Sequence, residues 1–161
     1  MASIRTGIGF DAHKLNHGTP LMIGGVHIKH DSGLEGHSDG DVLMHAIIDS
    51  ILGAASLGDI GTFFPSDDSD FKGISSGILL VRTREYVASA GYEVVFVDAT
   101  IIAQNPSIKP HVFNMESNIA KSLGLEGDSV NIKATTTDGL GVIGREEGIA
   151  CLSIATLEKI I

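Results

Sequence analysis

The chain has 161 residues, 43% hydrophobic and 19% charged, which predicts one folded domain over residues 1–161. Its 11 basic and 20 acidic residues give a formal net charge of −9, and this balance disfavours nucleic acid or an anionic membrane as a partner. The single cysteine, Cys151, excludes an intrachain disulfide. No apolar run reaches the ~20 residues that span a bilayer, and the first residues lack a secretory signal, so we expect a cytoplasmic protein.

In chain order, the apolar patterning and the turn residues predict a mixture of strands and helices. The predicted strands cover 4–10, 20–28 (interrupted at Gly24–Gly25), 92–103, 130–134 and 148–157, and the predicted helices cover 41–56, 75–90 and 110–123. Residues 62–73 are rich in turn formers and are predicted to form a mobile loop. We therefore predict an α+β fold, a two-layer α/β sandwich in which one mixed sheet carries helices on one face.

The last predicted strand is apolar or small on both faces, which leaves two interpretations open. Either it is a central strand enclosed within the chain, or its second face packs against the sheet of another copy, since three helices cover only one side. The alternating residues are Ile149, Cys151, Ser153, Ala155 and Leu157 on one face, and Ala150, Leu152, Ile154 and Thr156 on the other.

Candidate metal ligands come from two predicted elements. Asp11 and His13 lie at the end of the first strand, where a period of two puts both side chains on one face. In the first predicted helix, Asp41, His45 and Asp49 form a polar stripe on an otherwise apolar cylinder. One interpretation is a histidine whose ring is satisfied by a flanking carboxylate. The other joins His45 to Asp11 and His13 in a three-ligand site with an open fourth position, the pattern of catalytic zinc.

A second polar segment, residues 135–139, consists of three threonines, an aspartate and a glycine at a predicted strand end. Its hydroxyls and amides suit phosphate oxygens, with Arg145 available for bidentate charge, whereas the alternative is ordinary strand threonine followed by a turn. Gly139–Gly144 matches the dinucleotide GxGxxG pattern, but only 17 residues follow Gly144, too few to complete a βαβ unit. Asp59, after the first predicted helix, offers a carboxylate suited to sugar or polyol hydroxyls.

Together, these stretches resemble a known enzyme family in the same order along nearly the whole chain. The matching segments are 9–13 (GFDAH), 37–41 (HSDGD) with His45, 58–61 (GDIG), 64–65 (FP), 101–104 (IIAQ), 133–137 (KATTT), 144–145 (GR) and 147–150 (EGIA). The sequence is similar to the 2-C-methyl-D-erythritol 2,4-cyclodiphosphate synthase family. The resemblance implies a phosphorus–oxygen lyase of the non-mevalonate isoprenoid pathway. Its substrate would be 4-diphosphocytidyl-2-C-methyl-D-erythritol 2-phosphate, converted to the cyclic diphosphate with release of CMP.

The resemblance also implies residue roles and an assembly. Asp11, His13 and His45 would hold Zn²⁺ or another divalent ion, and His37 and Thr136 would stabilise the transition state. A Mg²⁺ or Mn²⁺ ion would bind with the diphosphate. The implied assembly is a homotrimer with its sheets packed together and active sites between subunits. The implied substrate-binding residues are Asp11, His13, His37, Ser38, Asp59, Ile60, Gly61, Phe64, Ser66, Asp68, Ala103, Pro106, Ile108, Lys109, Thr135, Thr136, Thr137, Asp138, Val142 and Arg145.

Four residues depart from the family pattern and bear on substrate contacts. They are Asp138 for a common Glu, Ser66 for Asp, Val142 for Phe and Ser107 for Lys. Arg145 and Glu147 either contact substrate or line an inter-subunit channel that binds an isoprenoid diphosphate; the second is favoured. Two other activities stay open: a zinc-stabilised trimeric binding protein without turnover, and a metal phosphohydrolase. The expected location is the bacterial cytosol or a plastid stroma.

Overall fold

The protein is described by a computed structural model that covers residues 3–126 and 128–160. Its main sheet has five strands in the order β4-β1-β7-β5-β6, with β7 in the centre and antiparallel to both neighbours, while β5 and β6 are parallel. The strands of this sheet are β1 (Ile4–His17), β4 (Ser32–Leu34), β5 (Tyr92–Ile102), β6 (Val130–Thr135) and β7 (Gly148–Lys159). A separate hairpin joins β2 (Leu21–Ile23) to β3 (Val26–Ile28).

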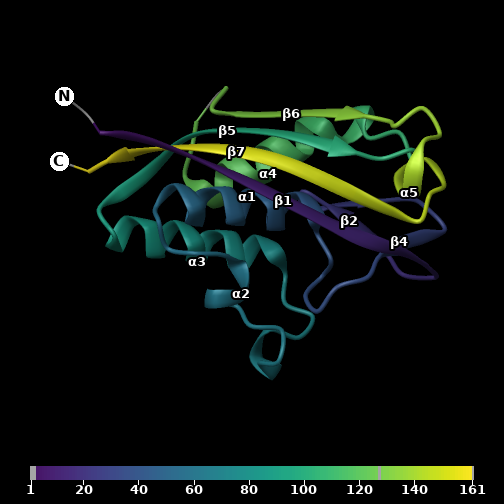
Figure 1. Ribbon diagram of the computed structural model, residues 1–161, viewed down its shortest axis with the longest axis horizontal. Helices are drawn as coiled ribbons and strands as arrows, with labels where there is room; N and C mark the ends of the chain where they lie inside the picture. The colour runs from purple at the N-terminus through teal and green to yellow at the C-terminus, as the bar shows by residue number, and fades with distance from the viewer. Residues whose placement is uncertain (1–2, 127, 161) are drawn as a thin grey trace.

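The long helices pack on one face of this sheet, as Figure 1 shows. They are α1 (Val42–Ala54), α3 (Ser76–Ser89) and α4 (Val112–Leu123), and α1 lies in the middle, against β1 and β7. The shorter elements are α2 (Ile60–Phe63), α5 (Gly141–Gly144) and the 3₁₀ turns η1 (Ser69–Phe71) and η2 (Lys109–His111). The predicted two-layer α+β sandwich is therefore confirmed. Among the described residues, no helix is long and apolar enough to cross a bilayer.

Several boundaries differ from those predicted. β1 continues to His17 instead of ending at residue 10, because it pairs with β7 as far as Lys14 and then with β4. The predicted strand at 20–28 is a hairpin, because Gly24 and Gly25 adopt positive φ angles of 59° and 68° at its turn. The predicted loop at 62–73 contains the end of α2 and all of η1, and the sequence patterns did not indicate β4 or α5.

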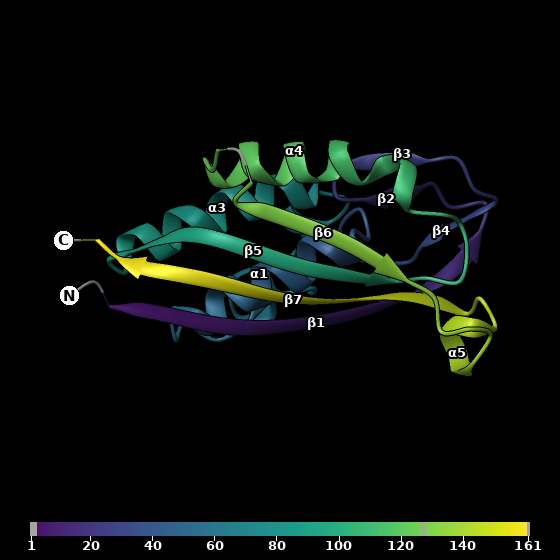
Figure 2. The same ribbon diagram turned by 90° about the horizontal axis from the view of Figure 1, so that it is seen from above.

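No part of the chain that the structure describes covers the second face of the sheet. β7 is the central strand, and its helix-facing side chains, such as Cys151 and Ala155, are buried, whereas on the other face only the small Ala150 is. Figure 2 looks onto the other face. Its large apolar side chains remain exposed: Ile4, Ile8 at 68%, Phe10 at 60%, Phe96, Leu152 and Ile154. The last strand is thus central, as the first interpretation has it, but it is not enclosed, because one of its faces lacks a cover, as the second interpretation expects.

The contact between α1 and β1 is tight because two strand residues that face the helix are glycines. A Cβ atom on Gly9 would lie 1.9 Å from the Ala46 carbonyl oxygen, and one on Gly7 would lie 2.2 Å from the Ser50 carbonyl oxygen. These distances are far inside van der Waals contact, so any side chain there would force the helix away from the strand. The glycines therefore set the spacing between the two elements.

We expect Gly9→Ala to lower the free energy of unfolding by about 3 kcal/mol or more, because the added methyl overlaps the α1 backbone. Gly53→Ala is the matched control, since its Cβ would meet only the Ile8 carbonyl oxygen at 3.9 Å. That change should stabilise the protein by up to about 1 kcal/mol through helix propensity. Urea unfolding monitored by circular dichroism measures both. Equal stability of the two variants would contradict the prediction.

Candidate active site

Three predicted ligands meet between β1 and α1. Asp11 and His13 project from β1 toward the helices, and His45 lies in the first turn of α1. The Asp11 Oδ2 atom is 2.7 Å from His13 Nε2 and 3.1 Å from His45 Nδ1, and these two nitrogens are 3.1 Å apart. One ligand atom from each residue lies within 4.8 Å of the others. The tight packing of α1 on β1 thus brings His45 next to Asp11 and His13, although His45 is more than 30 residues from either in the chain.

The outer nitrogen of each imidazole has its own partner, which orients the ring. His13 Nδ1 donates to the Glu35 carbonyl oxygen, so His13 Nε2 is the atom that faces Asp11. His45 Nε2 lies 2.9 Å from Ser38 Oγ and 3.0 Å from Ser76 Oγ, so His45 Nδ1 faces Asp11. Two imidazole nitrogens and one carboxylate oxygen converging in this way form a donor set that fits Zn²⁺ or a similar divalent ion.

The charges in this cluster shift the acid–base behaviour of its members. Burial raises the pKa of Asp11, but hydrogen bonds and charge from His13 and His45 outweigh it and hold that pKa well below its usual range. Burial lowers the pKa of His13, but the hydrogen bonds to Asp11 and to the Glu35 carbonyl, with the Asp11 charge, raise it above the usual value. The cluster therefore favours an ionised Asp11 beside a protonated His13 when no metal is bound.

The other two carboxylates of the predicted stripe do not join the cluster. Asp41 is fully buried and caps α1: it accepts from the Met44 amide and from the amides of Gly24 and Gly25 at 2.9 and 2.8 Å. Asp49 accepts from the Ile60 amide at 2.7 Å, and burial raises its pKa. Both side chains therefore hold loops and helix ends in place. Asp49 connects α1 to the start of α2.

A pocket of about 300 Å³ opens beside the metal cluster. It brings together nine of the predicted site residues, along with two that the sequence did not single out, Phe71 and Leu79. An apolar residue on a helix gives no signal that separates a pocket wall from the core, so neither could be recognised. The pocket is lined by Asp11, His13, His37, Ser38, His45, Ile60, Gly61, Phe64, Ser66, Phe71 and Leu79.

The loop before α3 is tied to this pocket through His37. The His37 Nε2 atom donates to the Asp68 carbonyl oxygen at 3.2 Å, and the Gly73 amide donates to the His37 carbonyl at 2.8 Å. Asp68 thus contributes its backbone rather than its carboxylate. Asp59 caps α2 by accepting from the Thr62 amide and hydroxyl at 2.9 and 2.8 Å, and it does not line the pocket.

A second predicted group forms a separate pocket of about 290 Å³ at the ends of β5 and β6. Its lining shares no residue with the metal pocket. Asp11, Ile101 and Ala134 lie in one row across the sheet, three strand spacings or about 14 Å from end to end. Thr135 belongs to the next row and faces the uncovered side. The pocket is lined by Ala103, Gln104, Asn105, Pro106, Ser107, Ile108, Lys109, Ala134, Thr135 and Thr136.

The predicted phosphate loop is stabilised by its own hydroxyls. Thr136 Oγ1 donates to the Asp138 carboxylate at 3.3 Å, and Thr137 Oγ1 donates to the Leu140 carbonyl at 2.7 Å. The Gly139 amide donates to Gln104 Oε1 at 3.1 Å, which joins this loop to the second pocket. Thr137 and Asp138 line neither pocket.

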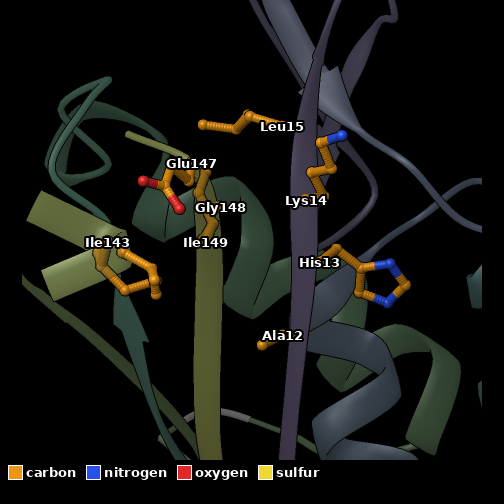
Figure 3. A pocket seen from close by; sticks show the side chains of 9 residues that line it. Ala12, His13, Lys14, Leu15, Ile143, Glu147, Gly148 and Ile149 are labelled. Carbon is orange, nitrogen blue, oxygen red and sulfur yellow. The ribbon is translucent and has the colours of Figure 1, made fainter. Parts of the chain in front are cut away.

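A larger cavity, about 590 Å³, lies between β1 and α5 and shares only His13 with the lining of the metal pocket. Figure 3 shows Ile143 and Glu147 on one side of β1 and the His13 ring turned away from them on the other. Val142 lines this cavity rather than either predicted pocket. Arg145 Nε donates to Glu147 Oε1 at 2.6 Å in an exposed ion pair. Val142 and this pair are therefore separate from the metal pocket in a single chain.

These features match one family of proteins. The chain belongs to the YgbB family, whose model matches residues 4–158. A relative from Clostridium botulinum named 2-C-methyl-D-erythritol 2,4-cyclodiphosphate synthase is 52% identical over 155 residues, which cover 96% of this chain and all of the relative. The family resemblance of the sequence is thus confirmed.

Solved structures agree with this assignment. The bifunctional IspDF of Campylobacter jejuni is 45% identical with a TM-score of 0.95; the match covers 99% of this chain but only 43% of that longer protein. IspF of Plasmodium falciparum, solved as a CDP complex, is 35% identical with a TM-score of 0.85, and the match covers 99% of this chain and 98% of that one. The likeness spans the whole sheet and its helices.

The metal-free protein should lose stability as the pH rises above about 6.5. The lowered pKa of Asp11 stabilises the fold above about pH 4. The raised pKa of His13 stabilises it fully below about pH 6.5, and this contribution is lost as the pH rises from there through the higher pKa of His13 in the folded protein. Urea unfolding with a chelator present, from about pH 5.5 to about pH 8.5, measures the slope. Asp11→Asn should flatten it, and a pH-independent wild type would show the pairing to be wrong.

Proposed function

We propose that this protein is a 2-C-methyl-D-erythritol 2,4-cyclodiphosphate synthase of the non-mevalonate isoprenoid pathway, a phosphorus–oxygen lyase. The observation that carries the proposal is the convergence of Asp11, His13 and His45 on one point beside a pocket, in a chain of this family. The substrate would be 4-diphosphocytidyl-2-C-methyl-D-erythritol 2-phosphate. Its products would be the cyclic diphosphate and CMP.

In the proposed reaction, an oxygen of the 2-phosphate attacks the β-phosphorus and forms a new P–O bond. The bond from the β-phosphorus to the bridging oxygen breaks, and that oxygen leaves on CMP with the electron pair. A phosphate is already ionised near neutral pH, so no side chain has to act as a base. Positioning and charge neutralisation then supply most of the rate, as in other phosphoryl transfers.

We assign Asp11, His13 and His45 as the ligands of a divalent ion, with zinc favoured by the donor set. When bound, such an ion supplies Lewis-acid charge neutralisation and a fixed template for phosphate oxygens. His37 and Ser38 line the same pocket and are assigned to phosphoryl oxygens. Ile60 and Gly61, at the start of α2, line the same pocket and are assigned to the erythritol end of the substrate.

The second pocket is assigned to the cytidine nucleotide. A related structure holds CDP, and the segment 103–109 together with Thr135 and Thr136 lines a separate small cavity. Thr136 is assigned to the diphosphate. Asp138 is assigned to a Mg²⁺ or Mn²⁺ ion bound with it, since hard carboxylate oxygens suit those ions.

We further propose that three copies assemble around the uncovered sheet face. The exposed apolar side chains of β1, β5 and β7 need burial. A neighbouring copy would also bring its nucleotide pocket to the metal pocket, which one chain keeps three strands apart. In this assembly, Arg145 and Glu147 would lie near the channel, where an isoprenoid diphosphate is the proposed ligand. A cytosolic location stays a prediction.

His45→Ala should abolish metal binding and lower turnover about 1,000-fold or more, because several kcal/mol of charge neutralisation are lost. The trimer should persist, since His45 faces away from the uncovered sheet. A phosphorus NMR time course with the cytidyl substrate and Mg²⁺ follows the cyclic diphosphate and CMP together. His27→Ala, an exposed imidazole on β3, is the control and should retain full activity.

The same time course separates the competing activities. Nucleotide binding without CMP release by a metal-loaded trimer would support the binding-protein alternative. Free inorganic phosphate in place of the cyclic product would support a phosphohydrolase. Full turnover by a metal-free His45→Ala protein would refute the ligand assignment.

Phe10→Asp should convert the trimer to a monomer, because it puts a charge at the centre of the uncovered apolar face. Phe113→Asp is the matched control: this phenylalanine on α4 is 79% exposed and lies on the opposite layer. Analytical ultracentrifugation measures both masses. If Phe10→Asp sediments as a trimer, or if the wild type is a monomer, the proposed interface is wrong.

A further inference from the structure

The two histidines of the metal cluster are held in place by groups that are not themselves ligands. Most of these groups come from one short loop. The segment 35–39 supplies the Glu35 carbonyl that holds His13 and the Ser38 hydroxyl that holds His45. The remaining support is Ser76, the first residue of α3, which is fully buried and lies 3.0 Å from His45 Nε2. Ser76 is 31 residues from His45 in the chain, so only the packing of α3 against α1 brings them together.

Ser76 is in turn fixed by a carboxylate. Its hydroxyl forms a short hydrogen bond to Asp39 Oδ1, and its amide donates to Asp39 Oδ2 at 3.0 Å. An ionised carboxylate only accepts hydrogen bonds, so the Ser76 O–H must point toward Asp39. The Ser76 oxygen then has lone pairs left for His45 Nε2–H. The chain of hydrogen bonds therefore has one direction, from His45 through Ser76 to Asp39.

We propose that Asp39 and Ser76 are positioning residues that hold His45 as the Nε2–H tautomer, with Nδ1 toward Asp11, and so set the affinity for the divalent ion. The inference rests on the proposed metal site. Partners of this kind on the outer nitrogen of a ligating histidine fix the ring and raise its basicity. In this protein the partner is a buried serine backed by a carboxylate.

Because Ser76 is present, Ser38 does not have to bind the substrate and pair with the His45 N–H at the same time. Ser38 touches His45 Nε2 and lines the open pocket, so its hydroxyl is within reach of a substrate. Ser76 is fully buried and does not line that pocket. When Ser38 turns to a phosphoryl oxygen, Ser76 keeps the His45 N–H paired. The ligand stays oriented during turnover.

The test compares two neighbouring serines. Ser76→Ala removes the acceptor for His45, whereas Ser75→Ala removes only the exposed N-cap of α3, whose hydroxyl accepts from the Gly77 amide. Zn²⁺ affinity is measured by competition with a chromophoric chelator, without substrate. We expect about 10-fold to 100-fold weaker binding for Ser76→Ala and a change of less than about two-fold for Ser75→Ala. Visible absorption of the Co²⁺-loaded proteins should also change for Ser76→Ala alone.

Asp39→Asn is the second variant, and it keeps the size of the side chain. Ser76 donates to two different oxygens of Asp39, and an amide has only one, so the substitution puts an NH₂ group opposite one of the two Ser76 donors. Weaker Zn²⁺ binding by this variant, with unchanged far-UV circular dichroism, supports the proposal even if Ser76→Ala fails to fold. Wild-type affinity in a folded Ser76→Ala or Asp39→Asn protein overturns it. A wild type that binds no divalent ion overturns the proposed metal site itself.

Discussion

The spacing between α1 and β1 determines where the chemistry of this protein can occur. Gly7 and Gly9 let the helix backbone approach the strand so closely that no side chain fits between them. One turn further along, the same approach brings His45 within 3.1 Å of the Asp11 carboxylate. A wider contact filled by alanine or valine would move the helix outward, and the three ligand atoms would no longer share one point. The packing of the core and the geometry of the site are therefore one constraint.

This constraint concentrates polar groups where the rest of α1 is apolar. Val42, Ile47 and Ile51 are fully buried around the helix, and Asp41 is buried at its start. Buried polar groups are tolerated only when they are paired, and the structure meets this demand in two ways. Asp41 is satisfied by backbone amides, so it serves the fold. The His45 Nε2 atom is paired with serine hydroxyls, and its Nδ1 atom faces Asp11, where we propose that a divalent ion binds.

The sequence predicted most of the layers and the convergence of Asp11, His13 and His45 on one point, because these depend largely on local periodicity. Asp11 and His13 share a strand face, and His45 interrupts an apolar helix. It did not show that Asp41 and Asp49, on the same stripe as His45, bind backbone amides instead of the imidazole, since that depends on the loops packed around the helix. The contact of Ser76 with His45 was also hidden, because it depends on how α3 packs against α1. β4 is defined by its pairing with the distant β1, and α5 is a single four-residue turn, so both have weak local signals.

The metal pocket and the nucleotide pocket share no residue and lie three strands apart. In the proposed trimer, each complete site therefore takes its two halves from two different chains. A chain damaged at His45 and another damaged at the 103–109 segment would each be inactive alone. Mixed in one assembly, however, they would form some sites in which both halves are intact. Two chains with defects in different pockets would then regain part of the activity when they are mixed, although neither is active by itself.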